Sequence, residues 1–491
     1  MTPFKSTPIK HPDMLYIDGG WTKPSTAGRI DVLDSASEEI FLSVAEAQAS
    51  DVQLAVGAAR RAFDQGPWPR MSHDERATYL EKIAAALLHR SDTLADHWSA
   101  ETGVLRSMSA YSGAGLAQIF SYYAGLAATF SWQERHRAED GKPALLVREP
   151  VGVVAAIVPW NAPGLLMAYK VAPALIAGCT VIVKASPEAP SAAYVFAEIC
   201  EEIGLPAGVV NVITAQRDVS ELLVRHKGVD KVTFTGSTAA GRKIGAICGE
   251  RIARCTLELG GKSPAIILDD FDIDQAAQSL AASTALMGGQ VCAALTRIII
   301  PQKRHDAFVD ALSAAMEQVK VGDPFADDSQ MGPMSSASHR DRVEQYIAKG
   351  KASPARLALG GGRPRDLNRG YYVEPTVFAD VDNDLVIARE EIFGPVVCVI
   401  PSADEEQAVD IANDSDFGLN ASIFTNDAER AYRVGRRLRT GTVGVNAFKF
   451  DFSIGFGGFK QSGVGREGGP DGVLPFLEAK TMLFDTMPAS V

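Results

Sequence analysis

Short apolar runs rich in β-branched residues alternate with helix-period segments from about residue 151 onward. These runs are apolar at nearly every position, which is typical of strands buried on both faces of a parallel sheet. Between two of them, Ala192, Val195, Phe196 and Ile199 fall on one helical face. The alternation predicts a doubly wound α/β fold that binds ligands at the carboxyl ends of its strands. The strands predicted for this first series are 151–158, 180–184, 209–213, 231–235 and 255–259.

A second alternating series begins after Gly260 and Gly261. A chain of 491 residues is too long for one hydrophobic core, so this series predicts a second α/β domain. A polar insert at 130–149 and a strand-like segment at 470–491 fit neither series, and we interpret them as arms that contact another subunit. The second series consists of predicted strands at 264–270, 297–301, 396–400, 421–425 and 442–446, a long helix over 276–287, and helices over 306–319, 405–413 and 428–438.

The composition argues against several classes of function. The net charge of −12 opposes nucleic acid or an anionic membrane as the main partner, since both require basic patches. No apolar run is long enough to span a bilayer, and the N-terminal residues lack the apolar core of a signal peptide. The six cysteines form no C-x-x-C pair and the eight histidines form no ligand motif. We therefore expect a protein of the reducing cytoplasm without a metal site.

Two glycine motifs compete as the dinucleotide site. The formal G-x-G-x-x-G at 463–468 follows a turn-rich loop and meets Pro470 too soon for a long helix, so we interpret it as a decoy. The stretch FTGSTAAG at 234–241 leaves a predicted strand and enters a predicted helix. There Gly236 and Ser237 would place N–H groups and a hydroxyl at a helix N-terminus, where a pyrophosphate binds favourably.

Cys292 follows two glycines and a glutamine in GGQVCAALTR. A cysteine in an apolar run is usually inert packing, and Lys184 at the end of a strand is by itself most simply a solvated strand end. Other motifs change both interpretations. They are PWN at 159–161, LELGGK at 257–262, FTGS at 234–237, EIFGP at 391–395 and GGFKQSG at 457–463, together with GQVC at 289–292.

In this order and spacing, the motifs resemble the NAD(P)-dependent aldehyde dehydrogenase superfamily of the hydrolytic, non-CoA-acylating type. The resemblance runs from LYIDGGW near residue 15 to FLEAKT near residue 480. It implies two doubly wound domains, one Rossmann-like and one catalytic, with a small β oligomerisation arm. The implied dinucleotide-binding domain is 1–129 with 150–260, the catalytic domain is 261–461, and the bridging segments are 130–149 and 470–491.

The resemblance assigns the chemistry to a few side chains. Direct oxidation of an aldehyde is difficult because its carbon must first become tetrahedral before it can release hydride. The Cys292 thiolate would make a thiohemiacetal, with the Asn161 amide and the Cys292 N–H stabilising the oxyanion. After hydride transfer, water activated by Glu258 would release the acid from the thioester. Lys170 and Glu467 match a proton path behind this base, although they could equally form a buried ion pair.

The resemblance also implies a cofactor site and a self-associating enzyme, as a homodimer or homotetramer. Lys184 and Glu391 would hold ribose hydroxyls. Many family members carry an acid three positions after this lysine, where Pro187 stands here and the acid is displaced to Glu188. We favour NAD over NADP because no arginine follows to bind a 2′-phosphate. The implied cofactor-binding residues are Val158, Pro159, Trp160, Lys184, Ser186, Glu188, Gly236, Ser237, Leu259, Glu391 and Phe393.

The implied substrate tunnel is mostly apolar, which predicts a medium-sized hydrophobic or aromatic aldehyde. Lys449 or Arg297 would alter this prediction if either pointed inward. A CoA-acylating enzyme is an alternative, but those relatives generally lack the glutamate corresponding to Glu258. A cysteine-dependent esterase or hydrolase is another, and it usually needs a histidine near Cys292. A non-catalytic protein with the same fold is the third. The implied tunnel residues are Ala162, Leu166, Tyr169, Leu286, Val291 and Phe456.

Overall fold

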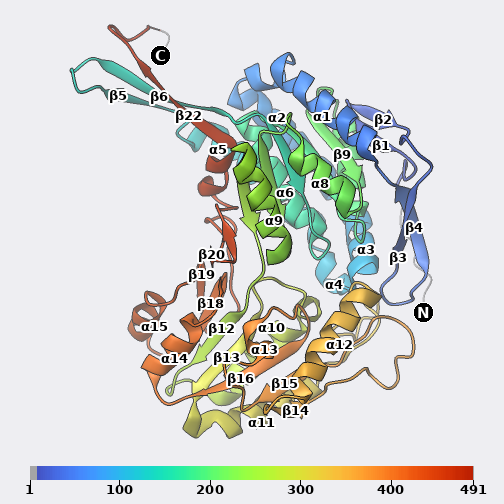
Figure 1. Ribbon diagram of the computed structural model, residues 1–491, viewed down its shortest axis with the longest axis vertical. Coiled ribbons are helices and arrows are strands. Elements are labelled where there is room, and N and C mark those ends of the chain that lie inside the picture. Colours follow the sequence, from blue (N-terminus) through green and yellow to red (C-terminus); the bar gives the residue numbers. More distant parts are fainter. Residues whose placement is uncertain (1–7, 490–491) are drawn as a thin grey trace.

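The structure is a computed structural model that describes residues 8–489, and two large sheets dominate it (Figure 1). The first sheet has the order β2-β1-β9-β8-β7-β10-β11-β21, and its central strands are parallel. Each strand predicted in the first series is confirmed, with bounds shifted by a few residues at most. The strands are β1 (Leu15–Ile17), β2 (Gly20–Thr22), β7 (Val153–Ile157), β8 (Thr180–Ala185), β9 (Val210–Thr214), β10 (Lys231–Thr235), β11 (Arg254–Glu258) and β21 (Gly463–Val464).

Helices cover both faces of the first sheet, as its apolar strands require. Along β7, Val153 and Ala155 pack into one core while Val154 and Ala156 pack into the other, because successive side chains point to opposite faces. Helices α1, α8 and α9 cover the first face, and α2, α5, α6 and α7 cover the second. The helices in this part of the chain are α1 (Ala49–Asp64), α2 (His73–His89), α3 (Ser91–Thr102), α4 (Arg106–Ser109), α5 (Ser112–Thr129), α6 (Pro163–Ala177), α7 (Ser191–Glu202), α8 (Arg217–Arg225) and α9 (Thr238–Arg251).

The second sheet has the order β14-β15-β16-β13-β12-β18-β19, with only the edge strand β14 antiparallel. Helices α10 and α11 cover one face, and α12, α13, α14 and α15 cover the other. The elements are β12 (Ser263–Ile267), α10 (Ile273–Ala285), β13 (Leu295–Pro301), α11 (His305–Glu317), α12 (Ala337–Lys351), β14 (Arg356–Leu359), β15 (Thr376–Ala379), α13 (Val386–Arg389), β16 (Val396–Ser402), α14 (Glu405–Asn413), β18 (Asn420–Phe424), α15 (Ala428–Gly435) and β19 (Thr442–Val445).

The helix predicted over 276–287 is wrong at its carboxyl end. It ends at Ala285, and a short 3₁₀ turn, η2 (Leu286–Gly289), follows it. Met287 and Gly288 have φ values of 52° and 61°, which an α-helix does not allow. The chain therefore turns sharply just before Cys292.

A three-stranded sheet projects from the body of the molecule (Figure 1). In it β6 (Pro143–Pro150) pairs with β5 (Gln133–Arg137) on one side and with β22 (Leu477–Leu483) on the other. The insert and Leu477–Leu483 of the C-terminal segment thus form one arm, whereas Val473 and Phe476 of that segment are buried in the core of the first sheet, and 490–491 lie outside the described residues. The domain bounds assigned from the sequence remain a prediction. The remaining strands form two small pairs, β3 (Arg29–Leu33) with β4 (Ile40–Ala45) and β17 (Phe417–Gly418) with β20 (Phe459–Lys460).

Within residues 8–489, no helix combines the length and the apolar character needed to cross a membrane.

Candidate active site

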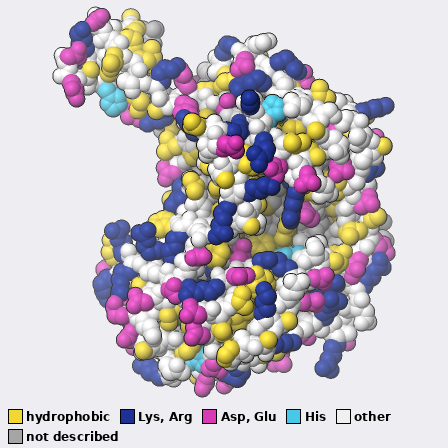
Figure 2. All heavy atoms as spheres, viewed as in Figure 1, with side chains coloured by type: hydrophobic (Ala, Val, Ile, Leu, Met, Phe, Trp, Pro, Cys, Tyr) yellow, Lys and Arg dark blue, Asp and Glu magenta, His cyan; other side chains and the backbone are white. Residues whose placement is uncertain are grey.

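The carboxyl ends of β7, β10 and β11 open into a cleft of about 1130 Å³ that also receives the loop before β13. Figure 2 shows a hollow in the molecular surface between the upper and lower halves of the molecule. Trp160 and Asn161 enter the cleft from the end of β7, Gly236 and Ser237 from the end of β10, and Cys292 from the loop. The cleft therefore brings together residues separated by more than a hundred positions in the chain.

The glycines before Cys292 permit a close approach of backbones. Gly289 has a φ of +72°, and a Cβ there would lie 2.3 Å from the carbonyl oxygen of Gly394. A Cβ on Gly261, which follows β11, would lie 2.4 Å from the Cys292 carbonyl oxygen. Both distances are far below van der Waals contact, so side chains at these positions would push Cys292 out of place.

The Gln290 side chain holds the same loop in place through buried hydrogen bonds. Its side chain is 1% exposed, its Nε2 donates to the Met287 carbonyl at 2.9 Å, and its Oε1 accepts from the Ser335 N–H at 2.9 Å. The Asn161 Nδ2 donates to the Gln290 carbonyl at 3.0 Å, which holds the Asn161 amide beside the cysteine loop. The second hydrogen of that amide stays available for a ligand.

Burial strongly disfavours charge on the two reactive groups. The pKa of the Cys292 thiol is raised to about 12 by burial and by the negative charges of Glu391 and Glu258. The pKa of Glu258 is raised well above its ordinary value by burial and by the charge of Glu467. Among the described residues, neither carboxyl oxygen of Glu258 has a hydrogen-bond partner. Glu258 ends β11 directly before Leu259, which lines the cleft, and such an unsatisfied buried carboxyl group is a candidate general base.

Lys170 and Glu467 form a buried ion pair behind Glu258. Lys170 comes from α6, and its Nζ also donates to Thr235 Oγ1 at 2.6 Å. Thr233 Oγ1 donates to Glu467 Oε1 at 3.3 Å. The geometry therefore supports an ion pair between these two residues, and a role for them in proton transfer stays a prediction.

Most of the predicted cofactor residues line the cleft. Ser237 caps α9 by accepting from the Ala240 N–H at 3.3 Å, so its hydroxyl and the free N–H groups lie at a helix N-terminus. Glu391 Oε1 accepts from the Gly261 N–H at 3.1 Å, and burial raises the pKa of Glu391 to about 7. The predicted residues in the lining are Pro159, Trp160, Gly236, Ser237, Leu259, Glu391 and Phe393.

Four predicted cofactor residues, Val158, Lys184, Ser186 and Glu188, lie outside the residues that line the cleft as the structure stands. Burial lowers the pKa of Lys184 to about 8, opposed by the nearby carboxylate of Glu188. Within residues 8–489 the Lys184 ammonium has no hydrogen bond or ion pair, while the exposed Glu188 accepts a hydrogen bond from the Ser186 hydroxyl. Among the described residues, the nearby Glu188 carboxylate is thus the group that offsets the burial of Lys184.

Several polar residues of the cleft were not predicted from the sequence. Arg217 is the first residue of α8 and follows β9, a position that the predicted strand at 209–213 could have indicated. His339 and Arg342 come from α12 and carry no sequence signal. His339 Nε2 donates to the Phe393 carbonyl at 2.7 Å, and burial lowers the pKa of His339 to about 4. The ring is therefore neutral at physiological pH.

An aromatic wall stands beside Cys292. Val291 and Cys292 pack against the apolar cluster that contains Phe456. The Phe452 ring lies 4.7 Å from that of Phe456 and stacks on Tyr169 at 4.2 Å. Phe452 was not predicted from the sequence, because the loop that carries it has no periodic pattern. Three of the predicted tunnel residues thus belong to one wall.

The other predicted tunnel residues are placed differently. Ala162 lines a separate small cavity, Leu166 is buried in α6, and Leu286 is half-buried in η2. Arg297 does not point into the tunnel, because its guanidinium is buried and donates to the carbonyls of Lys262 and Ala412, among others. The Lys449 side chain is exposed.

A nucleotide-binding sheet whose strand ends meet a half-buried cysteine, an amide and an unpaired carboxyl group defines an oxidoreductase that can hold a carbonyl substrate covalently. Residues 21–482 match the model of the aldehyde dehydrogenase family. The chain belongs to this family, and it is an oxidoreductase that acts on aldehydes.

Relatives of known activity extend over the same length. Geranial dehydrogenase from Castellaniella defragrans is 43% identical over 95% of this chain and 98% of its own. The chloroplastic betaine aldehyde dehydrogenase from Beta vulgaris is 36% identical over 96% of each chain. The crystal structure of a Mycobacterium tuberculosis aldehyde dehydrogenase complexed with NAD+ is 43% identical, covers 98% of this chain and 99% of its own, and superposes with a TM-score of 0.95. The predicted family and fold class are confirmed.

Proposed function

We propose that this enzyme oxidises an uncharged, medium-sized apolar or aromatic aldehyde to its carboxylic acid with NAD+. The observation that carries the substrate class is the wall formed by Tyr169, Phe452 and Phe456 beside Cys292. A carboxylate placed against such a wall would lose its water without gaining a partner, whereas an apolar aldehyde chain buries its own apolar surface there. The relatives act on both uncharged and cationic aldehydes, so the substrate class rests on the wall rather than on their names.

The cleft fits a dinucleotide. It is large enough for an extended ligand, and it presents the N-terminus of α9 at Ser237 to a pyrophosphate. Glu391 and the Lys184 ammonium are groups that can bind ribose hydroxyls. When bound, NAD+ supplies the hydride acceptor of the reaction. NAD+ is favoured over NADP+ because the Glu188 carboxylate near Lys184 would repel a 2′-phosphate.

The residues of the chain carry out the remaining steps. The sulfur of Cys292 bonds to the carbonyl carbon while the carbonyl π electrons move to oxygen, and the thiol proton passes to water in the cleft. The Asn161 amide and the Cys292 N–H donate to that oxyanion. When the oxyanion reforms a carbonyl and hydride leaves, a thioester remains. Glu258 then takes a proton from water, the hydroxide adds to the thioester carbon, and the carbon–sulfur bond breaks to release the acid.

Two observations disfavour the alternatives. Glu258 is present and buried in the cleft region, which supports hydrolysis rather than transfer to coenzyme A. Across the described chain, no hydrogen bond joins a histidine to the Cys292 thiol, and the Nε2 of His339 is already bonded to Phe393. A cysteine hydrolase would need such a base.

An aldehyde panel tests the proposal. Octanal, benzaldehyde, geranial, betaine aldehyde and succinate semialdehyde are compared by kcat/KM with NAD+ and NADP+, and the products are identified with and without coenzyme A. We expect NAD+-dependent acid formation that is fastest with the uncharged aldehydes. Cys292→Ser should abolish oxidation while leaving NAD+ binding intact, and Cys255→Ser is the matched control because Cys255 lies on β11 outside the cleft lining. A preference for succinate semialdehyde or betaine aldehyde would refute the apolar substrate class.

We also propose that the arm formed by 130–149 and 470–491 contacts a second copy of the chain, giving a dimer or tetramer. Its β22 strand carries Leu483, which is 70% exposed. Exposed apolar side chains on a projecting strand are usually buried against another chain. The cytoplasm is the proposed compartment, because none of the six cysteines is paired. Light scattering of the full chain gives the assembly, and a monomer at micromolar concentration would contradict it.

A further inference from the structure

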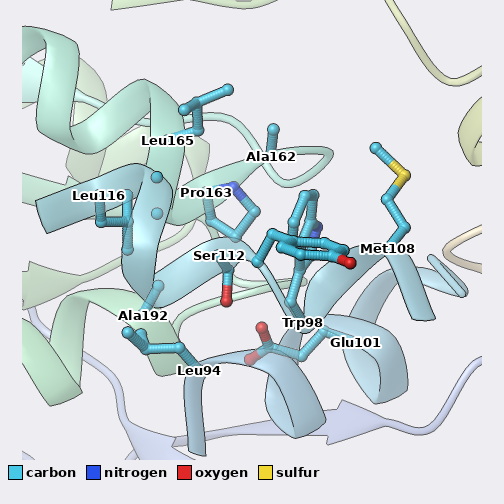
Figure 3. A pocket seen from close by; sticks show the side chains of 13 residues that line it. Leu94, Trp98, Glu101, Met108, Ser112, Leu116, Ala162, Pro163, Leu165 and Ala192 are labelled. Atoms are coloured by element: carbon cyan, nitrogen blue, oxygen red, sulfur yellow. The ribbon is translucent and has the colours of Figure 1, made fainter. Parts of the chain in front are cut away.

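A second, partly open pocket of about 190 Å³ lies between α3, α5 and the start of α6 (Figure 3). Most of its wall is apolar, with Leu94, Met108, Leu116 and Leu165 among the side chains that line it. A cavity of about 150 Å³ in a protein core can hold a benzene ring, so this one has room for a ring or a short chain.

Two buried polar atoms in this cavity lack partners. Glu101 is 1% exposed, and its Oε1 accepts from the Ser191 N–H at 3.0 Å and from the Ser191 hydroxyl. Within residues 8–489, the Glu101 Oε2 and the Ser112 Oγ have no hydrogen bond. Figure 3 shows the Ser112 hydroxyl directed toward the Glu101 carboxyl group across the cavity. Leaving such buried groups unsatisfied is unfavourable, and a ligand that hydrogen-bonds to them would remove this penalty.

The cavity adjoins the residue that would hold the oxyanion. Ala162 lines the cavity and directly follows Asn161. Trp98 also lines the cavity, and its Nε1 donates to the Asn161 carbonyl at 2.9 Å. Trp98 and Glu101 lie three residues apart on α3, hence on the same face of that helix. Ala162 and Trp98 thus place the pocket against the backbone of Asn161.

We propose that this cavity is the distal part of the aldehyde-binding site and that it takes the far end of a substrate carrying a terminal hydroxyl group, bound by Glu101 and Ser112. The inference rests on the proposed function and narrows its substrate class. A hydroxyl both donates and accepts, so it can satisfy the carboxyl group and the serine together.

Charge considerations favour a neutral hydroxyl over an ion. Burial raises the pKa of Glu101 to about 8, so the group is mainly an uncharged carboxylic acid at neutral pH. A substrate carboxylate would meet no cation in the residues that line the cavity. An ammonium group would require Glu101 to ionise inside an apolar wall, which burial opposes.

The test compares hexanal, octanal and decanal with their ω-hydroxy counterparts, using the full enzyme and NAD+. For the chain length that reaches the cavity, we expect kcat/KM to favour the hydroxy aldehyde by about 5- to 30-fold, mainly through KM, since one neutral hydrogen-bonded pair discriminates by that order. Ser112→Ala and Glu101→Gln should each reduce this preference severalfold while leaving oxidation of the plain aldehydes near the parental rate.

Ser121→Ala is the matched control, because Ser121 lies on the same helix and donates to Glu81 at 2.8 Å outside the cavity. Glu101→Gln can weaken the start of α7, because Glu101 accepts a hydrogen bond from the Ser191 N–H. If Glu101→Gln fails to fold, the result with Ser112→Ala decides the test. Equal kcat/KM for every plain and hydroxy pair would overturn the inference alone. Failure to oxidise either series would overturn the proposed function with it.

Discussion

Replacement of Glu258 by glutamine is the sharpest test of how this site works. The two side chains have nearly the same volume, and the carboxyl oxygens have no hydrogen-bond partners among the described residues. The substitution therefore removes the base without breaking a hydrogen bond. A positioned general base contributes about 100- to 10,000-fold to a proton-transfer step. We expect hydrolysis of the thioester to slow by that factor, while formation of the first NADH changes little.

Stopped-flow absorbance of NADH with octanal measures both phases. Glu258→Gln should release about one NADH per active site in a fast burst and then turn over slowly, with the thioester on Cys292 detectable by mass spectrometry after acid quench. Glu258→Asp retains the carboxylate on a shorter side chain and should give an intermediate rate. Parental steady-state turnover, or a slow first turnover without a burst, would refute the assigned role.

The same variant also predicts a pH dependence of stability. The pKa of Glu258 is higher in the folded protein than in the unfolded chain, so the folded state binds this proton more tightly. The resulting stabilisation is complete below the unfolded pKa of about 4.3 and is lost as the pH rises through the folded pKa. Glu258→Gln should thus gain stability relative to the parent as the pH increases, as measured by thermal unfolding between pH 5 and pH 9. A constant difference in Tm would contradict the raised pKa.

Further predictions concern the ion pair and the adenosine end of the cofactor. Lys170→Met leaves Glu467 buried without its cation and should lower the free energy of unfolding by about 3–5 kcal/mol in chemical denaturation. Adding Glu467→Gln should restore part of this loss, and the coupling would be contradicted if the free-energy changes of the two single variants simply added in the double variant. Glu188→Gln should raise the kcat/KM ratio of NADP+ to NAD+ by about fivefold by removing a repulsive charge. Arg217→Gln should lower the same ratio, because this cation lines the cleft near Lys184; an unchanged ratio in both variants would show that the 2′-position is recognised elsewhere.

Much of the fold could be predicted because it depends on local patterns. The strand at 231–235 was predicted with its observed bounds, since four consecutive apolar or β-branched residues at 232–235, ended by Gly236, admit few other structures. The end of α10 was misplaced, because the left-handed conformation at Met287 has no signal in a residue that ordinarily favours helix. Phe452 and His339 were missed for a related reason, since they reach the site through a loop and a distant helix.

The sequence by itself determined the two alternating α/β series and the family, because these depend on the order of residue types along the chain, and it supplied the reactive residues that we propose. Only the tertiary structure decided which groups meet. It placed the Asn161 amide on the Gln290 carbonyl, buried Arg297 away from the tunnel, and aimed Glu101 and Ser112 into one cavity. Such contacts join positions far apart in the chain, and their geometry follows from packing of whole elements rather than from any local pattern.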